Sequence, residues 1–197
     1  MNFFYYFLIG HLTGDFLLQS NKIVEWKKKY FAGILLHSLI VFLSTLVIFI
    51  PYLNHILIWQ CLFINFVFHI IIDYFKITYE KKNPQINPFL SFLTDQIAHI
   101  VIILFLFFLI PKNLNPYFFT EKWWFEIYQN THLLFYLSGF LFFSYTFDIM
   151  FFIYQLSKNK TNFYSRSYYS MIIRIFLFAI LFLLFLMKNY LFIANSV

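Results

Sequence analysis

The sequence predicts an all-α protein that crosses a membrane several times, as a polytopic bundle of about six transmembrane helices. Of its 197 residues, 62% are hydrophobic and only 11% are charged, whereas soluble domains carry about 25% charged residues. Apolar stretches of roughly 20 residues, enough to cross a hydrocarbon core as a helix, recur along the whole chain. The single cysteine excludes an internal disulfide and a cysteine-rich metal motif.

Each predicted span ends at a polar or proline-containing segment. In chain order the six spans are residues 2–20, 31–50, 56–75, 89–110, 133–156 and 171–192. Pro51 allows a tight turn between the second and third spans, and Pro111 and Pro116 bracket the exit from the fourth. Residues 118–130, which include Trp123 and Trp124, have the composition of an interfacial segment.

The polar residues within the spans divide the chain into two regions of one structural domain. Residues 1–110 are predicted to form a four-helix membrane core that carries the buried ionisable groups. Residues 111–197 comprise a linker with the interfacial segment and two further spans. We expect the first four spans to form two parallel helical hairpins that pack as one bundle.

Basic residues concentrate in alternate loops, and this asymmetry predicts the orientation of the chain. The loops at 21–30, 77–88 and 157–168 are rich in lysine or arginine, whereas the turn after the second span has neither. The positive-inside rule therefore places these three loops in the cytoplasm and both termini outside. Lys27, Lys28 and Lys29 are most simply interpreted as part of this topogenic charge. The net charge of +6 thus indicates a lipid bilayer as partner and no nucleic acid.

The strongest functional signal is a set of ionisable residues inside the spans. Six of them form pairs at i,i+4, so that both side chains share one helix face, and a seventh stands alone. The pairs are His11 with Asp15, His69 with Asp73, and Asp95 with His99; the single residue is His37. In the predicted topology all seven lie toward the cytoplasmic ends of their helices. Ionisable groups at membrane depth are costly and indicate a functional site.

The order of these motifs resembles a family of bacterial membrane proteins grouped as domain of unknown function 3307. Its pattern is H-x-x-x-D-F-x-x-Q, a lone downstream His, H-x-x-x-D-x-x-K and D-Q-x-x-H. The matching residues are His11, Asp15, Phe16, Gln19, His37, His69, Asp73, Lys76, Asp95, Gln96 and His99. The resemblance covers about the first 110 residues. It implies a multi-pass protein of the bacterial inner (cytoplasmic) membrane and assigns no reaction.

The seven residues offer imidazole nitrogens and carboxylate oxygens, which suit Zn²⁺, with Mn²⁺ and Fe²⁺ as alternatives, better than copper(I). They exceed the ligands of one tetrahedral zinc. Either two ions bind, bridged by an Asp, or one ion binds and the other groups support it and supply a general base. The predicted metal ligands are His11, Asp15, His37, His69, Asp73, Asp95 and His99. The predicted catalytic carboxylates are Asp15, Asp73 and Asp95, with Gln19, Gln96 and Lys76 as supporting groups.

The leading hypothesis is an integral membrane metal-dependent hydrolase of a lipid or lipid-linked phosphoester, with its site facing the cytoplasm. The alternatives are a transporter of protons or divalent metal, and a structural subunit of a membrane complex whose His–Asp contacts join helices. The absence of H-E-x-x-H, G-x-S-x-G and Walker A motifs disfavours zincins, serine hydrolases and P-loop NTPases. We also expect Asp148 in the fifth span to pair with Arg174 in the sixth.

Overall fold

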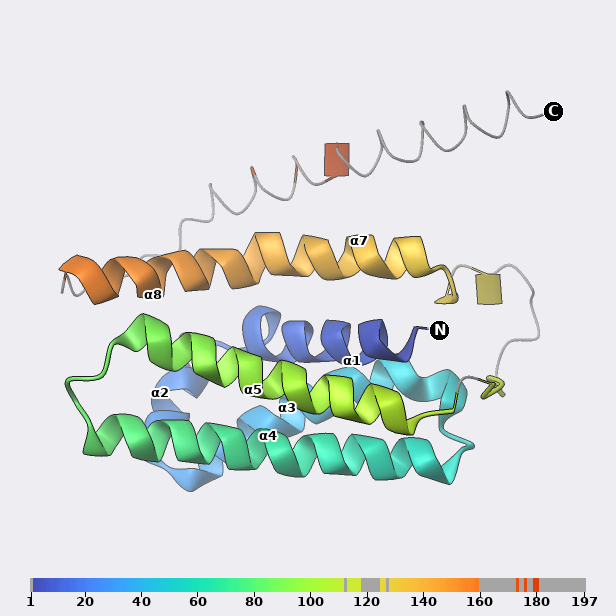
Figure 1. Cartoon of the computed structure of the whole chain (residues 1–197), viewed down its shortest axis with the longest axis horizontal. Helices are drawn as coiled ribbons and strands as arrows, with labels where there is room; N and C mark the ends of the chain where they lie inside the picture. Colours follow the sequence, from blue (N-terminus) through green and yellow to red (C-terminus); the bar gives the residue numbers. More distant parts are fainter. Residues whose placement is uncertain are drawn as a thin grey trace.

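The computed structural model describes residues 2–111, 113–117, 125, 126 and 128–159, with four further single positions at 173, 176, 179 and 180. Within these residues the chain is helical and has no strand, so the all-α prediction is confirmed (Figure 1). The elements are α1 (Phe3–Leu12), a π-helical segment η1 (Thr13–Leu17), α2 (Asn21–Lys29), α3 (Phe31–Phe49), a 3₁₀ turn η2 (Ile50–Tyr52), α4 (Ile56–Lys82), α5 (Pro88–Leu109), α7 (Thr131–Leu141), a second π-helical segment η3 (Phe142–Thr146) and α8 (Phe147–Asn159).

Within the described residues, four stretches are long and apolar enough to cross a membrane: Phe31–Tyr52, Ile56–Lys82, Pro88–Leu109 and Thr131–Lys158. They correspond to the second to fifth predicted spans. The first predicted span is helical only from Phe3 to Leu17, because the chain turns before α2, where the Ser20 hydroxyl caps the new helix. Arg174 and most of the sixth predicted span, of the interfacial segment and of loop 157–168 lie outside the described residues.

Helices α1, α3, α4 and α5 form a closed ring. In it α1 contacts α3, α3 contacts α4, α4 contacts α5, and α5 returns to α1. The continuous rod of α7, η3 and α8 lies along α1 and α5 (Figure 1). Because α1 is surrounded on several sides, most of its side chains are buried, as expected for a helix that is apolar all round.

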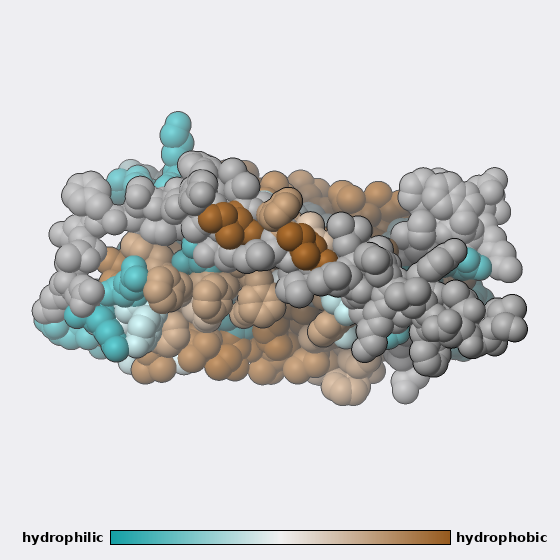
Figure 2. Space-filling model, turned by 90° about the horizontal axis from the view of Figure 1, so that it is seen from above, coloured by the Kyte–Doolittle hydropathy of each residue, from teal (hydrophilic) through white to brown (hydrophobic). Residues whose placement is uncertain are grey.

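Helices α3, α4 and α5 each turn one narrow stripe of side chains toward the centre, repeating every fourth residue. The stripe is Gly33, His37, Val41, Thr45 and Phe49 on α3, Cys61, Asn65, His69, Asp73 and Ile77 on α4, and Ser91, Asp95, His99 and Ile103 on α5. The i,i+4 spacing of the ionisable pairs coincides with this stripe. The pairs therefore face one another in the interior, and the opposite faces expose apolar side chains (Figure 2).

The two ends of the bundle differ in character. Near the N-terminus the interior is filled with aromatic rings: those of Phe3 and Phe49 stack at 6.1 Å, and those of Phe7 and Phe49 lie 4.6 Å apart. Tyr6 is also buried there and donates its hydroxyl to the carbonyl oxygen of Tyr128 at 3.0 Å. The opposite end carries α2 and the loop between α4 and α5 (Figure 1). We call this end of the bundle the loop end. The seven ionisable residues lie on the loop-end side of the aromatic core.

Candidate metal centre

The structure brings all seven predicted ligands into one buried cluster. They come from five elements: His11 from α1, Asp15 from η1, His37 from α3, His69 and Asp73 from α4, and Asp95 and His99 from α5. None of these residues is more than 6% exposed. Their nitrogen and oxygen atoms form three groups whose members lie within 4.8 Å of one another: Asp15–His37–His69, His11–His69–His99 and Asp73–Asp95–His99.

Two glycines allow α1 and η1 to approach α3 closely. A Cβ atom added to Gly14 would lie 2.6 Å from the Cα of Val41, and one added to Gly10 would lie 2.7 Å from the Cα of Thr45. Small residues spaced by four are a common means of close backbone contact between membrane helices. Since His11 and Asp15 directly follow these glycines, the contact also brings them close to α3.

Asp15 lies in the π-helical segment Thr13–Leu17, where the helix is locally widened. Such segments change the direction of side chains and are frequent at functional sites. The carboxylate reaches beyond its own helix: Asp15 Oδ1 lies 3.1 Å from His37 Nε2 on α3 and 3.3 Å from His69 Nε2 on α4. Its contact with His11, the partner predicted from the i,i+4 spacing, is longer, at 3.7 Å.

The three atoms Asp15 Oδ1, His37 Nε2 and His69 Nε2 form a nearly equilateral triangle. Its sides measure 3.1, 3.3 and, between the two nitrogens, 3.1 Å. Bonds of about 2.0–2.1 Å to a tetrahedral Zn²⁺ hold two ligand atoms about 3.3–3.4 Å apart. The triangle therefore has the spacing of three ligands around one ion. Asp73 Oδ2 lies close to the same histidines, 3.6 Å from His37 Nε2 and 3.9 Å from His69 Nε2.

Among the described residues, the buried atoms Asp95 Oδ1 and His99 Nε2 have no hydrogen-bond partner, and Asp15 Oδ1 has none apart from the two histidine nitrogens of the triangle. Buried polar atoms are almost always satisfied in native proteins, and each exception calls for an explanation such as an ion or a water molecule. All three atoms are good ligands for a divalent cation. A cation bound in the cluster would explain why they lack other partners.

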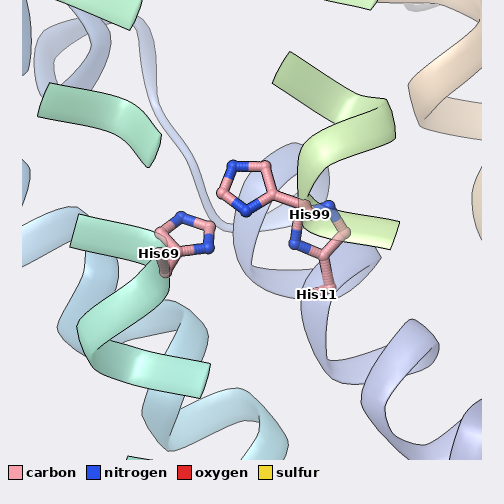
Figure 3. A group of neighbouring side chains, drawn as sticks. All are labelled: His11, His69 and His99. Carbon is pink, nitrogen blue, oxygen red and sulfur yellow. The ribbon is translucent and has the colours of Figure 1, made fainter. Parts of the chain in front are cut away.

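Three histidine rings, from α1, α4 and α5, converge beside this triangle (Figure 3). The rings of His69 and His99 stack with their centroids 4.3 Å apart, and those of His11 and His99 lie 4.9 Å apart. His69 belongs both to this group and to the triangle with Asp15, and His99 belongs also to the group with Asp73 and Asp95. The three groups are therefore one continuous constellation and not three separate sites.

The two predicted supporting glutamines contact the ligands directly. With its amide oriented to satisfy the surrounding network, Gln19 accepts from His37 Nδ1 and from Lys27 Nζ, both at 3.1 Å, and donates to the Asp15 carbonyl oxygen at 2.9 Å. Metal-binding histidines commonly donate their second ring nitrogen in this way, which directs the first toward the metal. Gln96 donates to Asp95 Oδ2 at 3.1 Å, and its Oε1 lies 3.3 Å from His11 Nε2.

Two lysines also enter the cluster. The third predicted supporting residue, Lys76, donates to Asp95 Oδ2 at 2.9 Å. Lys27, interpreted from the sequence as a topogenic loop residue, instead donates to both oxygens of Asp73, at 3.1 and 3.3 Å. The sequence analysis misses this role of Lys27 because it predicts a loop at residues 21–30, which form α2 in the structure. The sequence signal for the role is the i,i+4 spacing of Ile23 and Lys27, which places both on one helix face. Both side chains are half-buried on α2.

Comparison with known proteins identifies the family to which this site belongs. Residues 3–127 match a family model described as a protein of unknown function, DUF3307. The matched region contains α1 to α5 and therefore every residue of the cluster. No curated protein and no solved structure matches the chain.

Proposed function

Since the chain belongs to the DUF3307 family of proteins of unknown function, we propose its function from the site: a membrane-embedded, metal-dependent hydrolase of a lipid or lipid-linked ester. The observation that carries the proposal is the triangle of Asp15 Oδ1, His37 Nε2 and His69 Nε2, with sides of 3.1–3.3 Å. Two imidazoles and one carboxylate are the ligand set of several catalytic zinc sites, in which a fourth position remains for water or substrate.

The two lysines favour one ion over two. Two of the ligand groups, Asp15–His37–His69 and Asp73–Asp95–His99, share no residue and could in principle hold separate ions. However, both carboxylates of the second group already have a cationic partner, Lys27 or Lys76. The carboxylate of the first group, Asp15, has no lysine or arginine within 4.0 Å among the described residues and contacts only histidines at that range. We therefore place a single Zn²⁺, or Mn²⁺ or Fe²⁺ in its place, at the first group.

Asp15, His37 and His69 would hold the divalent ion, which would supply a polarised water molecule and a positive charge for an ester oxygen. In hydrolysis the water oxygen joins the phosphorus or acyl carbon, the bond to the ester oxygen breaks, and one proton passes from the water to the leaving alcohol. A carboxylate outside the metal ligands can carry that proton. Asp95 suits this role because its buried Oδ1 has no hydrogen-bond partner among the described residues and lies 3.7 Å from His99 Nε2, while Lys76 and Gln96 hold its Oδ2.

The position of the cluster supports a substrate that resides in the membrane. The cluster is surrounded by helices long and apolar enough to span a bilayer, and it lies on the loop-end side of the aromatic core. In the orientation predicted by the positive-inside rule, this is the cytoplasmic half of the bacterial inner membrane. A lipid or lipid-linked molecule can reach this depth without leaving the bilayer.

The packing of the other half of the bundle favours a hydrolase over a transporter. A transport path has to continue to the opposite side, whereas here Phe3, Phe7, Phe49 and Tyr52 fill the interior beyond the cluster, each at most 4% exposed. Among the described residues, the buried His and Asp side chains are confined to one side of this aromatic core.

The first test is the metal content of detergent-purified protein, measured by mass spectrometry after reloading with Zn²⁺, Mn²⁺ or Fe²⁺. We expect about one equivalent in the wild type and its loss in His37→Ala and Asp15→Ala. His55→Ala is the matched control, because His55 lies outside the cluster and contacts the Asn115 carbonyl oxygen. Metal-free wild-type protein would refute the proposal. The loaded protein should then hydrolyse a chromogenic phosphoester in micelles; metal flux in proteoliposomes without hydrolysis would instead indicate a transporter.

A further inference from the structure

We propose that Lys27 and Lys76 bind the phosphate group of the substrate at the loop end of the metal centre, which narrows the substrate to an anionic phosphoester. This inference rests on the proposed function, because it requires a metal in the Asp15–His37–His69 group. It adds a second binding element, built from two lysines on different helices.

Lys27 is directed inward by the way α2 packs. A Cβ added to Gly33, in the first turn of α3, would lie 2.5 Å from the main-chain nitrogen of Lys27, so the backbones of the two helices touch at this point. The other lysines of α2, Lys22, Lys28 and Lys29, are exposed, whereas the Lys27 side chain is 12% exposed. The same Cβ would lie 2.5 Å from the carbonyl carbon of Trp26, so the contact fixes the backbone of α2 at Trp26 and Lys27. Lys27 belongs to the centre because its ammonium group reaches both oxygens of Asp73, whereas the other lysines of α2 are exposed.

Lys76 approaches the cluster from α4. Its ammonium group lies 2.9 Å from Asp95 Oδ2 and 5.6 Å from the centre of the Phe92 ring, and its side chain is 20% exposed. A lysine near the end of a membrane helix ordinarily extends toward the headgroups. Lys76 instead turns toward the cluster, and its partial exposure keeps it within reach of an incoming ligand. Lys27 and Lys76 thus stand over adjacent carboxylates, Asp73 and Asp95, which belong to one ligand group.

The charge of the cluster indicates the sign of the ligand. Three carboxylates and two ammonium groups leave one negative charge when the histidines are neutral, as metal binding requires. A divalent ion converts this to one positive charge, in a region where an uncompensated charge is costly. A monoanionic ligand restores neutrality. A phosphate diester carries one negative charge, and lysine is a frequent phosphate-binding residue.

Phosphate binding also explains why cations are present beside a metal site at all. A lysine close to the ligands repels a metal cation and weakens its binding, so it brings no advantage to metal affinity alone. The same positive charge becomes favourable when an anion bridges the metal and the lysine. In that arrangement the ammonium groups donate hydrogen bonds to the phosphate oxygens while remaining near Asp73 and Asp95.

The test is binding of inorganic phosphate to detergent-purified, metal-loaded protein, measured by calorimetry together with metal content. The variants are Lys27→Gln and Lys76→Gln, and Lys28→Gln is the control from an exposed position on the same helix. We expect each of the first two to weaken phosphate binding by about tenfold or more at unchanged metal content, since a charge-assisted hydrogen bond is lost. We expect no change in Lys28→Gln.

The outcomes separate this inference from the proposed function. Equal phosphate affinity in all variants, or no phosphate binding by the loaded wild type, would overturn the inference and leave the metal site intact. Loss of metal in Lys27→Gln or Lys76→Gln would also overturn it, because the lysine would then be a structural counter-ion. Metal-free wild-type protein would remove both proposals together.

A second arm distinguishes the source of the phosphate. Inorganic phosphate is titrated into the protein in a phosphate-free detergent and in nanodiscs of phosphatidylglycerol, an anionic phosphodiester lipid. Weaker apparent phosphate binding in the nanodiscs would identify a membrane lipid headgroup as the ligand. Equal binding in both would identify a water-soluble phosphate compound. Either result requires the same two lysines.

Discussion

Replacing Gly14 by alanine should disrupt the metal centre although Gly14 is not itself a ligand, because it should displace Asp15. The new Cβ would lie 2.6 Å from the Cα of Val41, whereas carbon atoms in contact are about 3.5–4.0 Å apart. The obstacle is backbone, so η1 has to move away from α3 by about 1 Å. The distance from Asp15 Oδ1 to His37 Nε2, now 3.1 Å, would then approach 4 Å, well beyond the tolerance of about 0.2 Å for metal–ligand distances.

We therefore expect Gly14→Ala to weaken zinc binding by on the order of 100-fold, the upper range for changes that displace ligands without removing them. The measurement is competition for Zn²⁺ against a chromogenic chelator in detergent. The unfolding temperature is recorded in parallel, because overpacking alone costs about 1–3 kcal/mol. Leu17→Ala serves as the control, since Leu17 belongs to the same π-helical segment but is 39% exposed. A folded Gly14→Ala protein with wild-type zinc affinity would show that the close contact does not position Asp15.

Three further predictions follow from the same contacts. Gln19→Leu removes the hydrogen-bond acceptor of His37 Nδ1 and should weaken zinc binding about 10- to 100-fold. Gln19→Glu keeps an acceptor and should bind zinc nearly as the wild type does. An equal loss of zinc affinity in both variants would exclude this hydrogen bond as the cause. Gly33→Ala should push α2 away from α3 and so increase the acylation of Lys27 by an amine-reactive reagent, measured by peptide mass spectrometry. Unchanged labelling of Lys27 would contradict the proposed packing of α2 on α3. Zn²⁺ at 100 times its dissociation constant should stabilise the folded protein by about 2.7 kcal/mol and raise its unfolding temperature. His69→Ala should abolish this zinc-dependent rise. An identical rise in the variant would show that the ion binds elsewhere.

The amino-acid sequence alone determined the class of the protein and the membership of its cluster. Span prediction depends only on local composition and length, and the four spans from α3 to α8 occur where the apolar stretches were found. The i,i+4 spacing likewise depends only on helix geometry. It placed His69 with Asp73 and Asp95 with His99 on single faces, and those faces are the buried stripes of α4 and α5.

Only the tertiary structure decided which atoms of the cluster meet. The shortest contacts of Asp15 are with His37 and His69 on other helices and not with His11, because η1 is π-helical and Gly14 lets it approach α3. The inward position of Lys27 depends on a backbone contact with Gly33 across a helix junction. Neither feature is encoded in local periodicity, since each arises from the approach of two backbones that are separate in the sequence. For that reason the sequence could supply the seven ionisable residues of the cluster, whereas the place of Lys27 and the geometry of the site required the packed bundle.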